Sequence, residues 1–218
     1  SMKQLMRKLW YKQPAFLGQY IGKNLSKGCD LKYPWELSRF QHLITLGQAY
    51  KISGEEKYTL EFINQIKDWI ENNPVRYGIN WSNTMEVGVR VANWSIALLY
   101  IIESDNVTED FLNDYLQSID LHGKHIYRNL ENLQPINSNH YIGNLFGLFV
   151  LSIMFPFLYK APKWLKFSKK ELENEIIRQT DEDGWGYEAS TAYHKLVTEM
   201  FLFAFLISDH YKKSFSKI

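Results

Sequence analysis

Apolar residues recur at helical spacing along most of the chain, and the alternation typical of strands does not. In residues 55–74, Phe62, Ile66 and Trp69 fall on one helical face, and Pro74 lies just beyond the expected end. Comparable helical patterns occupy residues 35–54, 84–104, 108–131 and 190–211. The chain is therefore predicted to form about seven helices joined by short loops.

Two further signals shape the second half of the chain. Ser168 and Glu171 have the spacing of a capping box, which predicts a helix start at Ser168. Two glycines in "DEDGWGY" then interrupt the helical pattern before it resumes. Several helices are apolar on more than one face, which favours two concentric layers of helices. We expect an all-α fold, an incomplete α/α toroid of helical hairpins over residues 31–218, with an N-terminal lead-in over residues 1–30.

Residues 133–159 contain no Asp, Glu, Lys or Arg. A membrane span would need about 20 apolar residues. The strongly apolar part, residues 145–159, is shorter and is interrupted by Gly147, Ser152 and Pro156. A buried helix is the better interpretation, and no membrane span is expected.

Composition limits the function classes without choosing among them. With 218 residues, 45% of them hydrophobic, the chain can bury the core of one domain. It has 25 Lys and Arg against 24 Asp and Glu, so no strong field favours nucleic acid, which we exclude as a partner. Cys29 is the only cysteine, which excludes an internal disulfide and a cysteine metal cluster but leaves the compartment open.

The first residues, "SMKQLMRKLWYKQPAF", lack an apolar stretch of signal-peptide length. Ser1 before Met2 is expected to be a remnant of cloning, so a native leader could have been removed.

Asn139 and His140 stand at the entrance of the uncharged stretch. A helix start carries free N–H groups and partial positive charge, so these two side chains would lie where an anion is readily held. The alternative is structural: Asn139 caps the helix, and His140 is a half-buried histidine with its hydrogen bonds satisfied.

Other groups of polar residues support weaker hypotheses. His122 and His125 lie three apart with no third ligand nearby, so no metal or other cofactor is expected in this segment. Asp181, Glu182, Asp183 and Glu188 could serve a toroid glycoside hydrolase, which uses two carboxylates. Three acids in one turn are more typical of a solvated loop.

Four segments, in order, resemble the motifs of the heparinase II/III-like polysaccharide lyases. They are "WELSRFQHLITLGQAYKISGEEKY", "NPVRYGINWSNTMEVGVRVANW", "NSNHYIGNLFGL" and "DGWGYEASTAYHKLVTEMF". The resemblance implies an N-terminal α/α toroid followed by a β-sandwich that closes over the substrate cleft. Because this chain ends inside the helical part, it is expected to be a fragment that lacks its β-sandwich partner and tends to self-associate. A bacterial protein, periplasmic or secreted, is also implied.

The resemblance further implies β-elimination on a uronate-containing acidic polysaccharide, and it suggests site residues. Asn139 matches the asparagine that hydrogen-bonds the uronate carboxylate, and His140 matches a neighbouring donor or base. Tyr193 matches the tyrosine that acts as base, acid or both; its alternative is a core aromatic. Because an ordinary tyrosine has a pKa of about 10, a base role would need nearby positive charge or donors. His194 is a second choice, since neighbours on a helix point about 100° apart.

Three more residues are expected to contact substrate. The resemblance suggests that Glu86 and Arg90 line the cleft, whereas their spacing alone also fits a solvated ion pair. Trp81 is a candidate for stacking on sugar rings and is preferred to Trp35. The sequence leaves the identity of the polysaccharide open. A non-catalytic carbohydrate-binding or scaffold protein on the same fold is a further alternative.

Overall fold

The computed structural model describes residues 30–133 and 137–216, and within them it contains eight α-helices, one short 3-10 helix and no strand. Except for Asp30, the expected lead-in lies outside these residues, as does Cys29. The helices are α3 (Lys32–Leu37), α4 (His42–Ser53), α5 (Lys57–Asn72), η2 (Ile79–Trp81), α6 (Thr84–Ile101), α7 (Glu109–Arg128), α8 (Asn139–Met154), α9 (Ala161–Gln179) and α10 (Thr191–His210).

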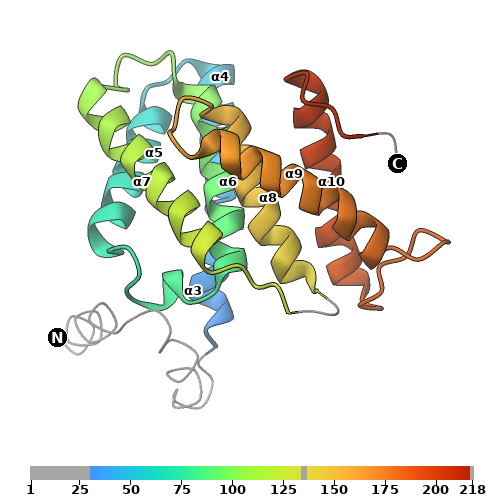
Figure 1. Cartoon of the computed structure of the whole chain (residues 1–218). Helices are drawn as coiled ribbons and strands as arrows, with labels where there is room; N and C mark the ends of the chain where they lie inside the picture. Colours follow the sequence, from blue (N-terminus) through green and yellow to red (C-terminus); the bar gives the residue numbers. More distant parts are fainter. Residues whose placement is uncertain (1–29, 134–136, 217–218) are drawn as a thin grey trace.

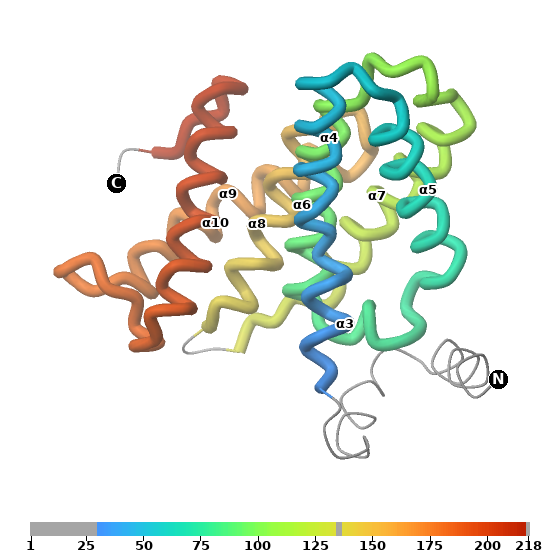
Figure 2. Tube along the Cα trace, turned by 180° about the vertical axis from the view of Figure 1, so that it is seen from behind, coloured from blue at the N-terminus to red at the C-terminus, as the bar shows by residue number. Residues whose placement is uncertain are grey.

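Alternate helices form a row in the order α4, α6, α8 and α10. Helix α6 packs against both α4 and α8, and α10 packs on the far side of α8. Helices α7 and α9 cover one face of this row, while α5 lies at the end beside α4 and α7 (Figures 1 and 2). The prediction of an all-α fold built from helical hairpins in two layers is therefore confirmed.

The two central helices approach each other closely because glycines face each other at their crossing. A Cβ atom added to Gly147 would lie 2.5 Å from the Cα of Gly88, and one added to Gly88 would lie 2.2 Å from the carbonyl oxygen of Gly143. Any larger residue would force the backbones apart. The glycines thus set the distance between the starts of α6 and α8, where the candidate site lies.

The uncharged stretch forms α8, which lies between α6, α9 and α10 and is buried along most of its length. The prediction of a buried helix is confirmed. None of the helices in the described residues is sufficiently long and apolar to cross a membrane.

Two predicted helix boundaries are wrong. Residues 35–54 form two helices rather than one, because the chain turns at Phe40, whose φ is 58°, and buries that ring. Helix α9 begins at Ala161, with Pro162 in its first turn, a favoured position for proline. Ser168 is consequently in mid-helix, where its hydroxyl donates to the carbonyl of Trp164 instead of capping.

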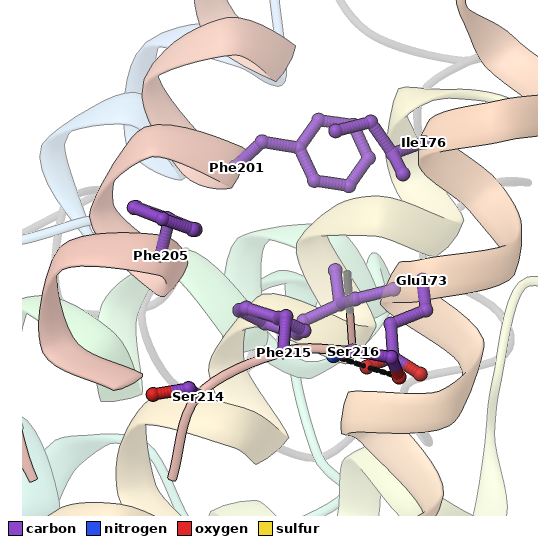
Figure 3. Close-up of a pocket in the computed structure, with 8 residues that line it drawn as sticks. Glu173, Ile176, Phe201, Phe205, Ser214, Phe215 and Ser216 are labelled. Atoms are coloured by element: carbon purple, nitrogen blue, oxygen red, sulfur yellow. Dashed lines mark hydrogen bonds between the residues drawn. The ribbon is translucent and has the colours of Figure 1, made fainter. Parts of the chain in front are cut away.

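An apolar groove of about 430 Å³ lies between α9 and the C-terminal end of α10 (Figure 3). Ile176 lines it from α9, Phe201 and Phe205 from α10, and Phe215 from the segment that follows. The adjoining part of α10 exposes more large apolar side chains, namely Leu202, Phe203 and Leu206. The last helix of the row therefore presents a largely unpartnered apolar face.

Candidate functional site

Three helices of the central row begin at the same end of the molecule. Helices α6, α8 and α10 all start near the lower edge of Figure 1. Helix N-termini carry partial positive charge and free N–H groups. Each of these helix starts is therefore a favourable place for an anion.

The N-terminus of α8 is capped by Ser138, whose hydroxyl oxygen accepts from the backbone N–H of His140 at 3.3 Å. The structural alternative that Asn139 is the cap is therefore wrong. Asn139 is the first helical residue, and its side chain does not cap the helix.

Asn139 holds a carboxylate. Its side-chain Nδ2 lies 2.9 Å and 3.0 Å from the two carboxylate oxygens of Glu188, and its backbone N–H donates to one of them at 3.1 Å. Asn139 is buried, whereas Glu188, just before α10, is partly exposed. The start of α8 thus has the donors that a carboxylate requires, and a side chain of the same chain occupies them.

His140 is paired with a second carboxylate. Its Nδ1 lies 2.9 Å from Oε1 of Glu131, in the loop between α7 and α8. The hydrogen bond that His140 donates to Glu131 is the largest effect on the pKa of His140; it raises that pKa and outweighs burial, and the charges of Glu131, Glu86 and Glu188 raise it further. The imidazole is therefore biased toward its protonated, cationic form.

Tyr193 lies in the first turn of α10 and is 45% exposed, so the alternative that it is a core aromatic is wrong. Tyr193 and His194 both line a narrow hollow with Glu188. The Nδ1 of His194 accepts from the backbone N–H of Gly186 at 3.3 Å, and its ring stacks on that of Trp185. Glu188, which Asn139 binds, thus lines the same hollow as Tyr193 and His194.

Glu86 and Arg90 do not form the solvated ion pair that their spacing suggested. Glu86 is buried and takes both hydrogen bonds of the Arg39 guanidinium, at 2.6 Å and 2.8 Å. Arg90 is fully buried, donates to His122 and to a backbone carbonyl, and lies over the ring of Trp69. Burial lowers the pKa of Arg90 to about 9. Neither a solvated ion pair nor a cleft-lining Arg90 fits this arrangement.

Trp81 also belongs to the core, with 2% of its surface exposed. Its ring packs against those of Trp69, His122 and His125. No face of the ring is open to a sugar, so the stacking role expected for Trp81 is wrong for this structure. Trp35, in contrast, is only partly buried.

The two histidines of "LHGKHIY" are core residues. His122 accepts from Arg90 through Nε2 and donates from Nδ1 to the carbonyl of Ser118 at 2.7 Å. Burial, and then the charge of Arg90, keeps the pKa of His122 well below its usual range; the same two causes lower that of His125 to about 4. Within the described part of the chain, no three His, Cys, Asp or Glu side chains are grouped to hold a metal ion.

The four acids of "DEDGWGYE" have different surroundings. Asp181, Glu182 and Asp183 are exposed in a turn, whereas the carboxylate of Glu188 is bound by Asn139. This arrangement does not favour a hydrolase built on these acids.

Three residues that sequence reasoning did not assign to the site are Glu131, Arg39 and Asn144, and no local pattern marks them.

The described residues form a layered helical protein in which Asn139, at the start of α8, binds the carboxylate of Glu188. The sequence model of the family described as Heparinase II/III N-terminus matches residues 4–215. The chain belongs to this family.

Named relatives agree with that membership. The chain is 26% identical over 220 residues to a heparin-sulfate lyase of Bacteroides stercoris, with 91% of this chain and 32% of the relative covered. It is 29% identical over 175 residues to a heparin-sulfate lyase of Bacteroides thetaiotaomicron, with 77% and 24% covered. The crystal structure of heparinase III has a TM-score of 0.76 and 26% identity, with 87% of this chain and 29% of that chain covered. The chain thus spans about a third or less of the length of these proteins.

Proposed function

We propose that the chain forms the helical part of a polysaccharide lyase that cleaves a uronate-containing acidic polysaccharide by β-elimination. The observation that carries the proposal is the carboxylate bound by the side chain and backbone of Asn139 at the start of α8. Family membership and relatives named heparin-sulfate lyase support the same class of reaction.

The reaction explains why such a site is needed. Removing the C5 proton of a uronate places negative charge beside a carboxylate that is already anionic, so the barrier is high until that charge is neutralised. Donors aimed at the carboxylate therefore lower the barrier most. In our proposal Asn139 and its backbone N–H bind the uronate carboxylate in the place that Glu188 occupies here.

The remaining roles follow from position. His140 is one residue beyond Asn139, and its raised pKa favours the cationic form, so in our proposal it adds charge stabilisation next to the carboxylate. Tyr193 is exposed beside Glu188, and its hydroxyl is assigned to proton transfer at C5 and at the leaving oxygen. The C4–O bond breaks, a C4–C5 double bond forms, and the oxygen leaves with a proton.

The proposal is tested with the protein encoded by the complete reading frame that contains this chain, and in parallel with the 218-residue chain. Heparan sulfate is the first polysaccharide to assay, followed by alginate and glucuronate-containing capsular polysaccharides. We expect ultraviolet absorbance from the conjugated double bond of the product, and its loss in Asn139→Ala. We also expect the 218-residue chain alone to be much less active.

Other outcomes would contradict the proposal. New reducing ends without double-bond absorbance would indicate a hydrolase. Binding of polysaccharide without cleavage would indicate a carbohydrate-binding protein. An Asn139→Ala variant that keeps full turnover would show that the carboxylate site is not the reacting site.

A further inference from the structure

We propose that Glu131 is a positioning residue for His140: it accepts the Nδ1 hydrogen, keeps the ring cationic, and leaves Nε2–H as the donor available at the start of α8. The inference rests on the proposed function, because the group that this donor would serve is the substrate carboxylate. It assigns a role to a residue in the loop before α8 that the family motifs quoted above do not contain.

The first support is the geometry of the pair. Nδ1 of His140 and Oε1 of Glu131 are 2.9 Å apart, a normal length for a charge-assisted hydrogen bond. The side chains are 39% and 25% exposed, so the pair lies at the surface of the site rather than in the core. Among residues 30–133 and 137–216, Nε2 of His140 has no hydrogen-bond partner.

The second support is that three hydrogen bonds hold Glu131, one with Met85 and two with Asn144. Its Oε2 accepts from the backbone N–H of Met85, in the first turn of α6, at 2.8 Å, and from Nδ2 of Asn144 at 3.0 Å. Asn144 is fully buried, and its Oδ1 in turn accepts from the backbone N–H of Glu131 at 2.7 Å. Hydrogen bonds to α6 and α8 therefore fix the carboxylate independently of its contact with His140.

This anchoring also defines what Glu131 does. Both of its oxygens already accept hydrogen bonds, one from His140 and the other from Met85 and Asn144. A carboxylate engaged in this way is a poor base for a substrate proton. It is well suited, however, to hold a neighbouring ring in one orientation and one tautomer.

The third support is the charge around His140. Three carboxylates act on it: Glu131, Glu86 and Glu188. Glu86 is compensated by Arg39, with which it forms an ion pair, and by the buried Arg90 one turn along α6. Near Glu188 lie Tyr193 and His194. His140 is thus the ion-pair partner of Glu131.

The pKa directions agree with the geometry. Burial acts to raise the pKa of Glu131, but the hydrogen bonds from His140 and Asn144, the attraction of His140 and the Met85 N–H outweigh it and lower that pKa. The pKa of His140 is raised, first by the Glu131 hydrogen bond. Between the two values both groups are charged, so His140 offers a proton on Nε2.

The first test is an NMR titration of His140 in the 218-residue chain, assigned with His140→Gln. We expect wild-type His140 to titrate above about 6.5 and Glu131→Gln to lower its pKa by about one unit, the low end for a partly exposed pair. The control is Glu103→Gln, which removes an exposed carboxylate paired with Lys51 and should leave His140 unchanged. A His140 pKa at or below 6.5, or one unaffected by Glu131→Gln, would overturn the proposal. If Glu131→Gln fails to fold, the wild-type titration decides alone.

The second test uses activity in the protein from the complete reading frame. If His140 must be protonated, turnover falls as pH rises through its pKa, and Glu131→Gln moves this alkaline limb about one pH unit lower. Above both pKa values its turnover is then about tenfold lower than wild type. A purely structural role for Glu131 would reduce activity at all pH values without moving the limb, which would refute the positioning role. If the protein has no lyase activity while the NMR shift occurs, the proposed function fails and the Glu131–His140 assignment stands.

Discussion

Replacing Glu188 by glutamine should increase the affinity of the site for an anionic sugar. In the structure the Glu188 carboxylate takes the Asn139 donors that our proposal assigns to a uronate carboxylate, so under the proposal a bound uronate must displace it or lie beside it. The glutamine side chain would keep an oxygen that accepts from Asn139 but would remove the competing negative charge.

The magnitude follows from Coulomb's law. Two like charges about 5 Å apart repel by about 0.8 kcal/mol in water and by about 3 kcal/mol at an effective dielectric constant of about 20. Because Glu188 is partly exposed, we take about 1 kcal/mol, which corresponds to about fivefold in the dissociation constant.

The assay is calorimetric titration of the 218-residue chain with a glucuronate-containing oligosaccharide at about pH 6, where His140 is charged. The matched control is Glu182→Gln, which removes an exposed charge from the same loop. We expect tighter binding for Glu188→Gln and little change for Glu182→Gln. Binding by Glu188→Gln that is equal to or weaker than wild type would refute the reasoning, because Glu188 would then support the site instead of competing for it.

Three further results are expected. Gly147→Ala should lower the free energy of unfolding by about 1–3 kcal/mol, because the new Cβ would lie 2.5 Å from the Cα of Gly88. This clash with the backbone outweighs the better helix propensity of alanine. Thermal melting that shows equal or higher stability would contradict the prediction. Wild type should be more stable than His140→Gln, and this difference should be lost as pH rises from about 6.5 through the raised pKa of His140. At the acid side, the part that depends on ionised Glu131 should be lost as pH falls below about 4.3. Denaturant melts that show no such pH window would exclude an ion pair. The exposed apolar face of α10 should make the 218-residue chain bind a hydrophobic dye and self-associate in sedimentation, and a monomer that binds no dye would show that this face is covered.

The helices were predictable because burial of an apolar face imposes a period that the sequence displays directly. The two boundary errors have a different origin. The turn at Phe40 depends on contacts far along the chain, since Arg39 pairs with Glu86, 47 residues away. Ser168 and Glu171 have capping-box spacing, but the helix had already begun seven residues earlier, at Ala161.

The place of a candidate site residue was predictable only where it follows from the pattern of a helix. Asn139 and His140 were expected at the start of a helix, and they lie in the first turn of α8. Their partners were not predicted, because Glu188 is 49 residues from Asn139 and Glu131 lies in an irregular loop. Trp81 and Arg90 were misassigned because their residue types suit both a sugar cleft and an aromatic core, and only the fold distinguishes the two.

The central claim is tested most directly by the turnover of Tyr193→Phe, measured by double-bond absorbance in the protein from the complete reading frame and compared with its melting temperature. The substitution removes only a hydroxyl from a side chain that is 45% exposed, so the melting temperature should barely change. If Tyr193 transfers the proton, turnover should fall by about 10²–10⁴, or about 3–5 kcal/mol of barrier. A folded Tyr193→Phe variant with turnover within a few-fold of wild type would contradict the account.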